Sequence, residues 1–126
     1  TGVTKAIAQV IPSLKGKLSG MSIRVPTPDV SVCDFSLEFS KDVSPEQVNQ
    51  ALKAAADGPM AKYIEYSEEQ LVSMDFKGNA HSAIVDALST IGIGGNMIKV
   101  IAWYDNEWGY SCRLGDLADF VARKGL

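Results

Sequence analysis

The most hydrophobic segment of this 126-residue sequence, Met97-Ile98-Lys99-Val100-Ile101-Ala102, constrains the fold more than any other stretch. A nearly unbroken apolar run of this length predicts a β-strand that is buried on both faces. Beyond Gly109 the apolar residues recur at helical spacing, at Tyr110, Leu114, Leu117, Ala118 and Val121. Arg123 and Lys124 favour the negative end of a helix at that point. The octet from Trp103 to Tyr110 is therefore predicted to be a corner between a strand and a helix.

This corner carries four aromatic side chains and the triplet Asp-Asn-Glu, a combination that is unusual where the chain only has to turn. Asn106 presents both a donor and an acceptor, which suits a ligand amide. A second interpretation is structural, with Trp103 and Tyr110 in the core and Asn106 as a turn residue. Residue chemistry alone favours neither interpretation.

The remaining segments predict helices and strands in an order that identifies the fold class. The clearest signal is the start of a helix at Ser44-Pro45-Glu46-Gln47, which combines an N-cap, a proline at the first helical position and a capping-box glutamine. Gly58-Pro59 is predicted to end this helix. We also expect a helix over 1–14, strands over 18–25 and 29–40, short strand segments over 63–66, 71–75 and 82–86, and a hairpin turn over 91–96. The phase change at Val32-Cys33 predicts a β-bulge or a sharp local twist. This order predicts an α+β fold, a mainly antiparallel or mixed sheet with about three helices packed on one face.

Composition excludes several classes of protein. The net charge of −3 and the pI near 5.0 argue against a nucleic-acid partner. No apolar run approaches the roughly 20 residues that a membrane span needs, so no membrane partner is expected. Cys33 and Cys112 fit neither a metal site nor a CxxC motif, which predicts an intracellular, cytoplasmic protein with no metal.

His81 is the sole histidine in the sequence, with Asp75, Ser82 and Asp86 nearby. These neighbours suggest a catalytic triad, but triads are assembled in space, so we favour a structural histidine beside a turn. Cys112 lies in the first turn of the last predicted helix, where the dipole would favour a thiolate. No partner base is visible for either cysteine, so an inert thiol is the favoured interpretation of both.

Two further positions are candidates for binding an anion. Thr1-Gly2 lies at the start of a predicted helix, where free N–H groups attract anions. Arg24 lies in a predicted strand with its side chain away from an apolar row, and its guanidinium is a forked donor that suits a phosphate. Together these residues would form a phosphate site if the fold brings them together.

Several segments closely resemble phosphorylating glyceraldehyde-3-phosphate dehydrogenase, in order and with compatible spacing over essentially the whole chain. The Arg-Val-Pro-Thr-Pro and Trp-Tyr-Asp-Asn-Glu motifs are the most specific. The segments are Thr1-Gly2 with the helix into Val10-Ile11-Pro12, Lys15 to Met21, Arg24 to Val32, Gly58-Pro59-Met60, and Trp103 to Ser111.

The resemblance implies that residues 1–126 are a fragment of the catalytic domain, without the NAD-binding Rossmann domain. The family's nucleophilic cysteine and its histidine base precede Thr1, so no catalytic residue is expected here. By resemblance, Thr1 and Gly2 hold the attacking inorganic phosphate, and Arg24 binds the substrate phosphate. Asn106 anchors the nicotinamide carboxamide, with the aromatic residues Tyr104 and Tyr110 near the nicotinamide side.

The resemblance also implies an activity and an assembly. The full-length enzyme would oxidise glyceraldehyde 3-phosphate with inorganic phosphate and NAD or NADP, as a homotetramer. Erythrose-4-phosphate dehydrogenase shares these motifs and is an alternative, as is a stand-alone, non-catalytic interaction domain. We expect the chain by itself to be inactive, to bind NAD poorly and to self-associate through surface that another domain would cover.

Overall fold

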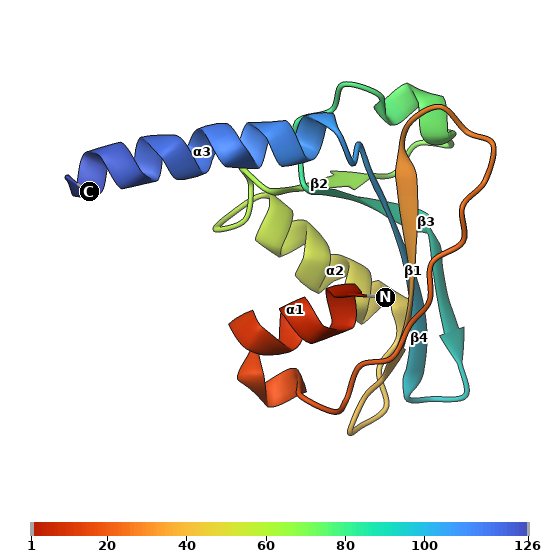
Figure 1. The fold of residues 1–126 in the computed structure, drawn as a ribbon. Coiled ribbons are helices and arrows are strands. Elements are labelled where there is room, and N and C mark those ends of the chain that lie inside the picture. The colour runs from red at the N-terminus through yellow and green to blue at the C-terminus, as the bar shows by residue number, and fades with distance from the viewer. Residues whose placement is uncertain (1, 126) are drawn as a thin grey trace.

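The computed structural model describes residues 2–125, and within them four strands form one mixed sheet (Figure 1). The strands are β1 (Ser31–Glu38), β2 (Ile64–Ser67), β3 (Ala83–Ile93) and β4 (Met97–Tyr104), in the spatial order β1-β4-β3-β2. β4 pairs antiparallel with both β1 and β3, whereas β2 runs parallel to β3. The predicted hairpin turn is confirmed between β3 and β4, where Gly94 and Gly95 adopt positive φ angles of 57° and 67°.

Three helices accompany the sheet in residues 2–125, and all lie on the same side of it (Figure 1). They are α1 (Gly2–Val10), α2 (Pro45–Ala56) and α3 (Trp108–Lys124), and the predicted α+β class is confirmed. α2 packs on β2 and β3, α1 packs on the 3₁₀ turn η1 (Pro12–Leu14), and α3 projects from the upper end of the sheet.

The predicted start of α2 is confirmed in detail. The Gln47 backbone N–H donates to Ser44 Oγ at 3.2 Å, and the Ser44 N–H donates to Gln47 Oε1 at 2.9 Å. This reciprocal pair satisfies two backbone donors that a helix end leaves open. The helix ends at Ala56 with Asp57 as its C-cap, immediately before Gly58-Pro59.

The core lies on both faces of the sheet and depends on the alternation of β3 and β4. Val85, Ile98 and Val100 face α2 and are covered by Val48 and Leu52. On the opposite face, a second cluster consists of Val30, Phe76 and Ile84, with the Trp103 ring stacked on Phe76 at 5.7 Å between centroids. The expectation that β4 is buried on both faces is only half met, because Lys99, Ile101 and Trp103 remain partly exposed.

Two predictions about the first half of the chain are wrong. Residues 18–25 form no strand, and Met21 and Ile23 are 82% and 73% exposed, because this alternating segment has no hydrogen-bonded strand partner in the described chain. The predicted bulge at Val32-Cys33 is absent, since β1 keeps an uninterrupted register with β4. The irregular residue is instead Val30, which has φ of 67° and precedes the strand.

Two of the predicted short segments also differ from the structure. Residues 71–75 are not a strand, because Ser73–Phe76 forms a 3₁₀ turn, η2, that delivers Phe76 to the core. The segment expected over 82–86 continues to Ile93, and its register with β4 is irregular between Asp86 and Ile91. No helix in residues 2–125 is long and apolar enough to cross a membrane.

Candidate functional site

The corner between β4 and α3 is organised by the carboxylate of Asp105. This side chain is only 2% exposed. Its Oδ1 accepts the N–H groups of Glu107 at 3.0 Å and Trp108 at 2.8 Å, and its Oδ2 accepts the N–H of Gly78 at 2.8 Å. Asp105 therefore satisfies free donors at the start of α3 and fastens the corner to the turn after η2.

These contacts favour the charged form of Asp105. The Gly78 N–H lowers the pKa of this carboxyl below its ordinary value of 3.8, and the N–H groups of Trp108 and Glu107 lower the pKa further. Burial acts in the opposite direction and raises the pKa, but the hydrogen bonds outweigh it. The corner is thus held by a buried anion whose hydrogen-bond donors in residues 2–125 are backbone N–H groups.

Asn106 follows Asp105 and has an exposed side chain. Its Oδ1 accepts a hydrogen bond from Ser31 Oγ at 3.0 Å, and Ser31 is the first residue of β1, opposite Tyr104 in the strand register. Within the described residues the Asn106 Nδ2 group makes no hydrogen bond. The amide therefore keeps two donors and one lone pair for a ligand.

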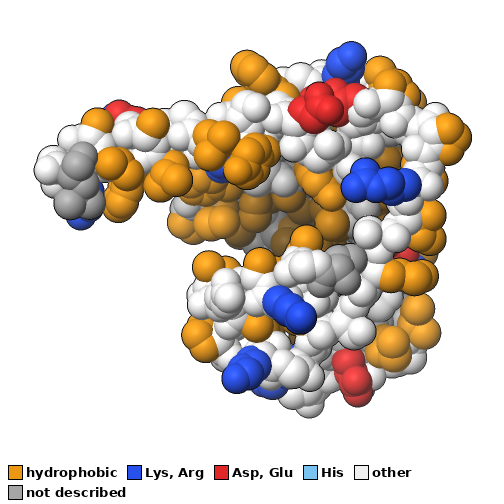
Figure 2. All heavy atoms as spheres, viewed as in Figure 1, with side chains coloured by type: hydrophobic (Ala, Val, Ile, Leu, Met, Phe, Trp, Pro, Cys, Tyr) orange, Lys and Arg blue, Asp and Glu red, His pale blue; other side chains and the backbone are white. Residues whose placement is uncertain are grey.

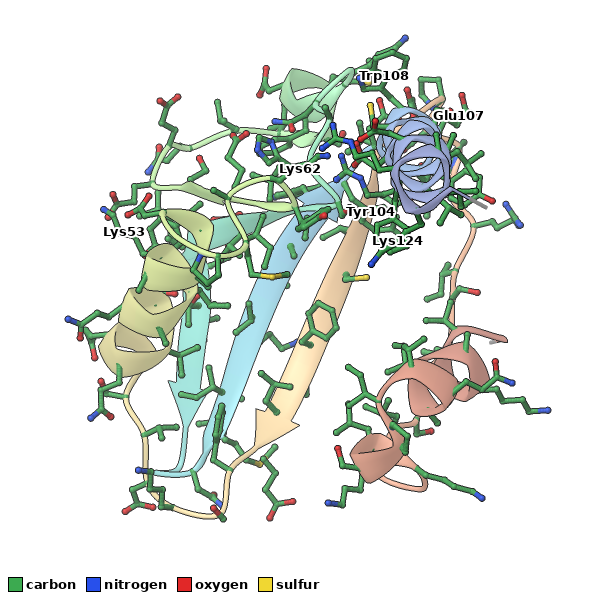
Figure 3. All side chains as sticks on the ribbon, turned by 90° about the vertical axis from the view of Figure 1, so that its left-hand side faces the viewer. Lys53, Lys62, Tyr104, Glu107, Trp108 and Lys124 are labelled. Carbon is green, nitrogen blue, oxygen red and sulfur yellow. The ribbon has the colours of Figure 1, made fainter. Side chains whose placement is uncertain are left out.

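The predicted cofactor-side residues gather at this corner. Tyr104 is the last residue of β4 and is partly buried, and Tyr110 lies in the first turn of α3 and is 64% exposed. Figure 3 shows Tyr104, Glu107 and Trp108 around the point where α3 begins. A polar amide with aromatic residues close to it in the chain suits a planar ring that carries an amide substituent.

No hydrogen bond or ion pair in residues 2–125 joins Arg24 or Gly2, two of the predicted substrate-side residues, to the corner. Arg24 is exposed in the segment that runs beside the sheet from η1 to the start of β1 (Figure 1). No hydrogen bond or ion pair in residues 2–125 holds its guanidinium, which leaves all five donors open to an anion. Gly2 is the first residue of α1, and Thr1 lies outside the described residues.

His81 lies in a polar cluster that differs from a catalytic triad. Its Nδ1 is 2.8 Å from Asn79 Oδ1 and 3.0 Å from Glu65 Oε2. The neighbours that suggested a triad point elsewhere, since Ser82 Oγ accepts a hydrogen bond from Arg113 at 3.1 Å and Asp86 binds Ser89. This arrangement supports the structural interpretation of His81.

The two cysteines, Cys33 and Cys112, are free and partly buried. No group of three potential metal ligands occurs in the part of the chain that the structure describes.

Comparison with known proteins decides the family. Residues 1–106 match the family model for the C-terminal domain of glyceraldehyde 3-phosphate dehydrogenase. The chain belongs to this family. It is 57% identical to glyceraldehyde-3-phosphate dehydrogenase of Geobacillus stearothermophilus over all 126 residues, which cover 38% of that protein. It is 54% identical to glyceraldehyde-3-phosphate dehydrogenase 1 of Bacillus subtilis over 126 residues, again 38% of the relative.

A distant relative gives the same result. Glyceraldehyde-3-phosphate dehydrogenase 1 of Caenorhabditis elegans is 49% identical over 125 residues, which are 99% of this chain and 37% of that protein. The chain thus spans less than two fifths of the length of the curated relatives that it matches.

This glyceraldehyde-3-phosphate dehydrogenase domain leaves a large apolar surface open on the side of the sheet where α2 packs. A groove of about 690 Å³ is lined there by Phe35, Leu37, Val48, Leu52 and Val100, among others. Figure 2 shows the hollow lined with hydrophobic side chains between α3 and α1. The apolar stripe predicted on α3 is also open, with Leu117 57% exposed, because the helix projects beyond the sheet.

Two residues of the site were missed by sequence reasoning. Asp105 carried a usable signal, because an aspartate just before a helical stripe is a common capping residue. Ser31 carried no signal in the sequence, since its partner Asn106 is 75 positions away in the chain.

Proposed function

We propose that this chain is the ligand-positioning part of a phosphorylating glyceraldehyde-3-phosphate dehydrogenase. The whole enzyme would convert glyceraldehyde 3-phosphate and inorganic phosphate to 1,3-bisphosphoglycerate, with NAD or NADP as the acceptor of hydride. The observation that carries the proposal is the corner in which buried Asp105 fixes the backbone and exposed Asn106 presents an amide with open Nδ2 donors. Membership of the family supports the same assignment.

Asn106 is the residue proposed to hold the nicotinamide. A carboxamide offers a carbonyl acceptor and two N–H donors, and the open Nδ2 donors and Oδ1 lone pair of Asn106 complement these groups. Such pairing would fix which face of the ring is turned toward the substrate. Tyr104 and Tyr110 would border the nicotinamide and limit its access to water.

Arg24 is proposed to bind the phosphate of the substrate, and Thr1 and Gly2 the attacking inorganic phosphate. A guanidinium binds a phosphate through two parallel N–H···O contacts, which position the aldehyde without taking part in bond making. The nucleophile and its base would come from the part of the enzyme that precedes this domain. Cys33, Cys112 and His81 have no proposed role in the chemistry.

We further propose that the full-length enzyme is a cytoplasmic homotetramer. The two free cysteines agree with a reducing compartment. The open apolar surfaces of this domain agree with cover by other parts of the assembly.

The test compares two variants of the full-length protein that carries this chain. Arg24→Ala is expected to lower kcat/KM for glyceraldehyde 3-phosphate by about ten- to hundredfold, the size of a lost charge-assisted contact, with cofactor affinity little changed. Asn106→Ala is expected to weaken cofactor binding and slow hydride transfer. Arg123→Ala is the matched control, because Arg123 is an exposed arginine paired with Asp119 near the end of α3.

Normal kinetics in Arg24→Ala with saturable substrate would remove that residue from the site. Normal cofactor affinity and a normal rate of hydride transfer in Asn106→Ala would show that the corner is not part of the cofactor site. Faster turnover of erythrose 4-phosphate than of glyceraldehyde 3-phosphate would reassign the substrate.

A further inference from the structure

Within residues 2–125 the side chain of Asn106 makes one hydrogen bond, and its donor lies on strand β1. Ser31 Oγ donates to Asn106 Oδ1 at 3.0 Å. An asparagine amide presents its donors on one side and its acceptor on the other, and a half-turn about the last side-chain bond exchanges them. Occupation of Oδ1 by a fixed donor therefore selects one of the two orientations.

We infer that Ser31 is a positioning residue for the nicotinamide side of the site, acting by fixing the orientation of the Asn106 amide. This inference rests on the proposed function of Asn106. Ser31 occupies one lone pair of Oδ1, and within residues 2–125 the second lone pair and the Nδ2 donors have no hydrogen-bond partner. A carboxamide can then pair with both, and the protein does not lose the entropy of ordering a free amide when the cofactor binds.

The position of Ser31 is itself determined by the fold. Its pairing opposite Tyr104 places the hydroxyl at the end of the sheet where the corner begins. The preceding residue, Val30, is buried in the core with φ of 67°, and its N–H donates to Asp29 Oδ1 at 2.7 Å. A β-branched residue adopts this conformation only where its surroundings require it. The backbone that leads into Ser31 is therefore held in one conformation.

Asp105 and Ser31 act on Asn106 in different ways. Asp105 holds the backbone on both sides of the corner, through Gly78 and the start of α3. Ser31 holds the side chain and touches no other group of the corner through a side-chain hydrogen bond in residues 2–125. Loss of the Ser31 hydroxyl is thus expected to leave the corner folded and the amide free to rotate.

The experiment uses the full-length protein with Ser31→Ala, Ser31→Thr and the control Ser36→Ala, an exposed serine of the same strand. Cofactor binding is measured by calorimetry with NAD, and with NADP in parallel, and KM values are measured for cofactor and aldehyde. Ser31→Ala is expected to weaken cofactor binding by about two- to tenfold, the worth of one neutral hydrogen bond, with the KM for aldehyde unchanged. Ser31→Thr, which keeps the hydroxyl, is expected to restore binding.

A double-mutant cycle separates this inference from the function on which it rests. In an Asn106→Ala background, Ser31→Ala is expected to cause no further loss of cofactor affinity. If Asn106→Ala weakens binding and Ser31→Ala does not, the inference is overturned and the function of Asn106 stands. If neither variant weakens binding, the proposed function fails. The positioning role would be overturned if Ser31→Ala weakened cofactor binding equally with and without the Asn106 side chain. It would also be overturned if Ser31→Ala raised the KM for aldehyde.

Discussion

Replacing Asp105 by alanine removes the acceptor that organises the corner, and the structure allows the cost to be estimated. Three backbone N–H groups lose a buried carboxylate that accepts them at 2.8–3.0 Å. A hydrogen bond to a charged group is worth roughly 1.5–3 kcal/mol, and the three are not additive because they share one anion. Water can reach some of the freed donors. We therefore expect Asp105→Ala to lower the free energy of unfolding by about 3 kcal/mol.

Urea unfolding of the 126-residue chain, followed by the fluorescence of its two tryptophans, measures this change. With an m-value of about 2 kcal/mol per molar urea, the midpoint should fall by roughly 1.5 M. Asp105→Asn keeps one acceptor oxygen and should lose about half as much. The control is Asp119→Ala, whose exposed partner is Arg123, and a change of roughly 0.5 kcal/mol or less is expected there. Equal midpoints for Asp105→Ala and Asp119→Ala would refute the reasoning.

The same carboxylate gives a pH dependence with a defined sign. Because folding lowers the pKa of Asp105 below 3.8, its stabilisation is present above that pH and is lost as the pH falls through the folded-state pKa. Wild type should therefore lose stability in acid more steeply than Asp105→Asn does. Parallel curves below pH 4 would contradict this.

Two further predictions concern the histidine and the apolar surfaces. His81→Asn in the full-length enzyme should leave the activation of the catalytic thiol intact. The rate at which that thiol is alkylated measures its activation. A much lower rate in a variant that still folds would show that the structural interpretation of His81 is wrong. The 126-residue chain should self-associate with rising concentration because its groove and the stripe on α3 are open. Leu117→Glu should shift the chain toward monomer in sedimentation velocity runs. An unchanged distribution of monomer and oligomers would show that the stripe on α3 takes no part in self-association.

Local signals in the sequence predicted several elements well. The capping box at Ser44 and Gln47 fixed the start of α2, because a cap depends on residues a few positions apart. The apolar run of β4 and the change of period after Gly109 predicted the corner for the same reason. The glycines in residues 91–96 predicted the turn between β3 and β4, where Gly94 and Gly95 adopt positive φ angles.

Predictions failed where the structure depends on distant partners. The alternation of Met21 and Ile23 is typical of a strand, but a strand also needs a neighbour to pair with, and none of the described strands pairs with this segment. The phase change near Val32 suggested a bulge, whereas the irregularity lies at Val30, whose side chain is held by Phe76 and Ile84 from far along the chain.

The site shows the same division. Asn106, Tyr104 and Tyr110 share one short stretch, so the sequence could group them. The link from Ser31 to Asn106 joins residues that only the pairing of β1 with β4 brings together. The resemblance supplied the proposed roles of Arg24 and Gly2, and no local pattern relates either residue to the corner.

We propose that this domain positions ligands and does not itself make or break bonds. The most direct measurement assays the purified 126-residue chain for NADH formation with glyceraldehyde 3-phosphate and inorganic phosphate, with a parallel titration of NAD by calorimetry. We expect no turnover above background, because a covalent nucleophile and its base supply most of the rate enhancement in such a reaction, and only weak NAD binding. Turnover that persists after removal of trace full-length enzyme would contradict the claim and require a second active site among Cys33, Cys112 and His81.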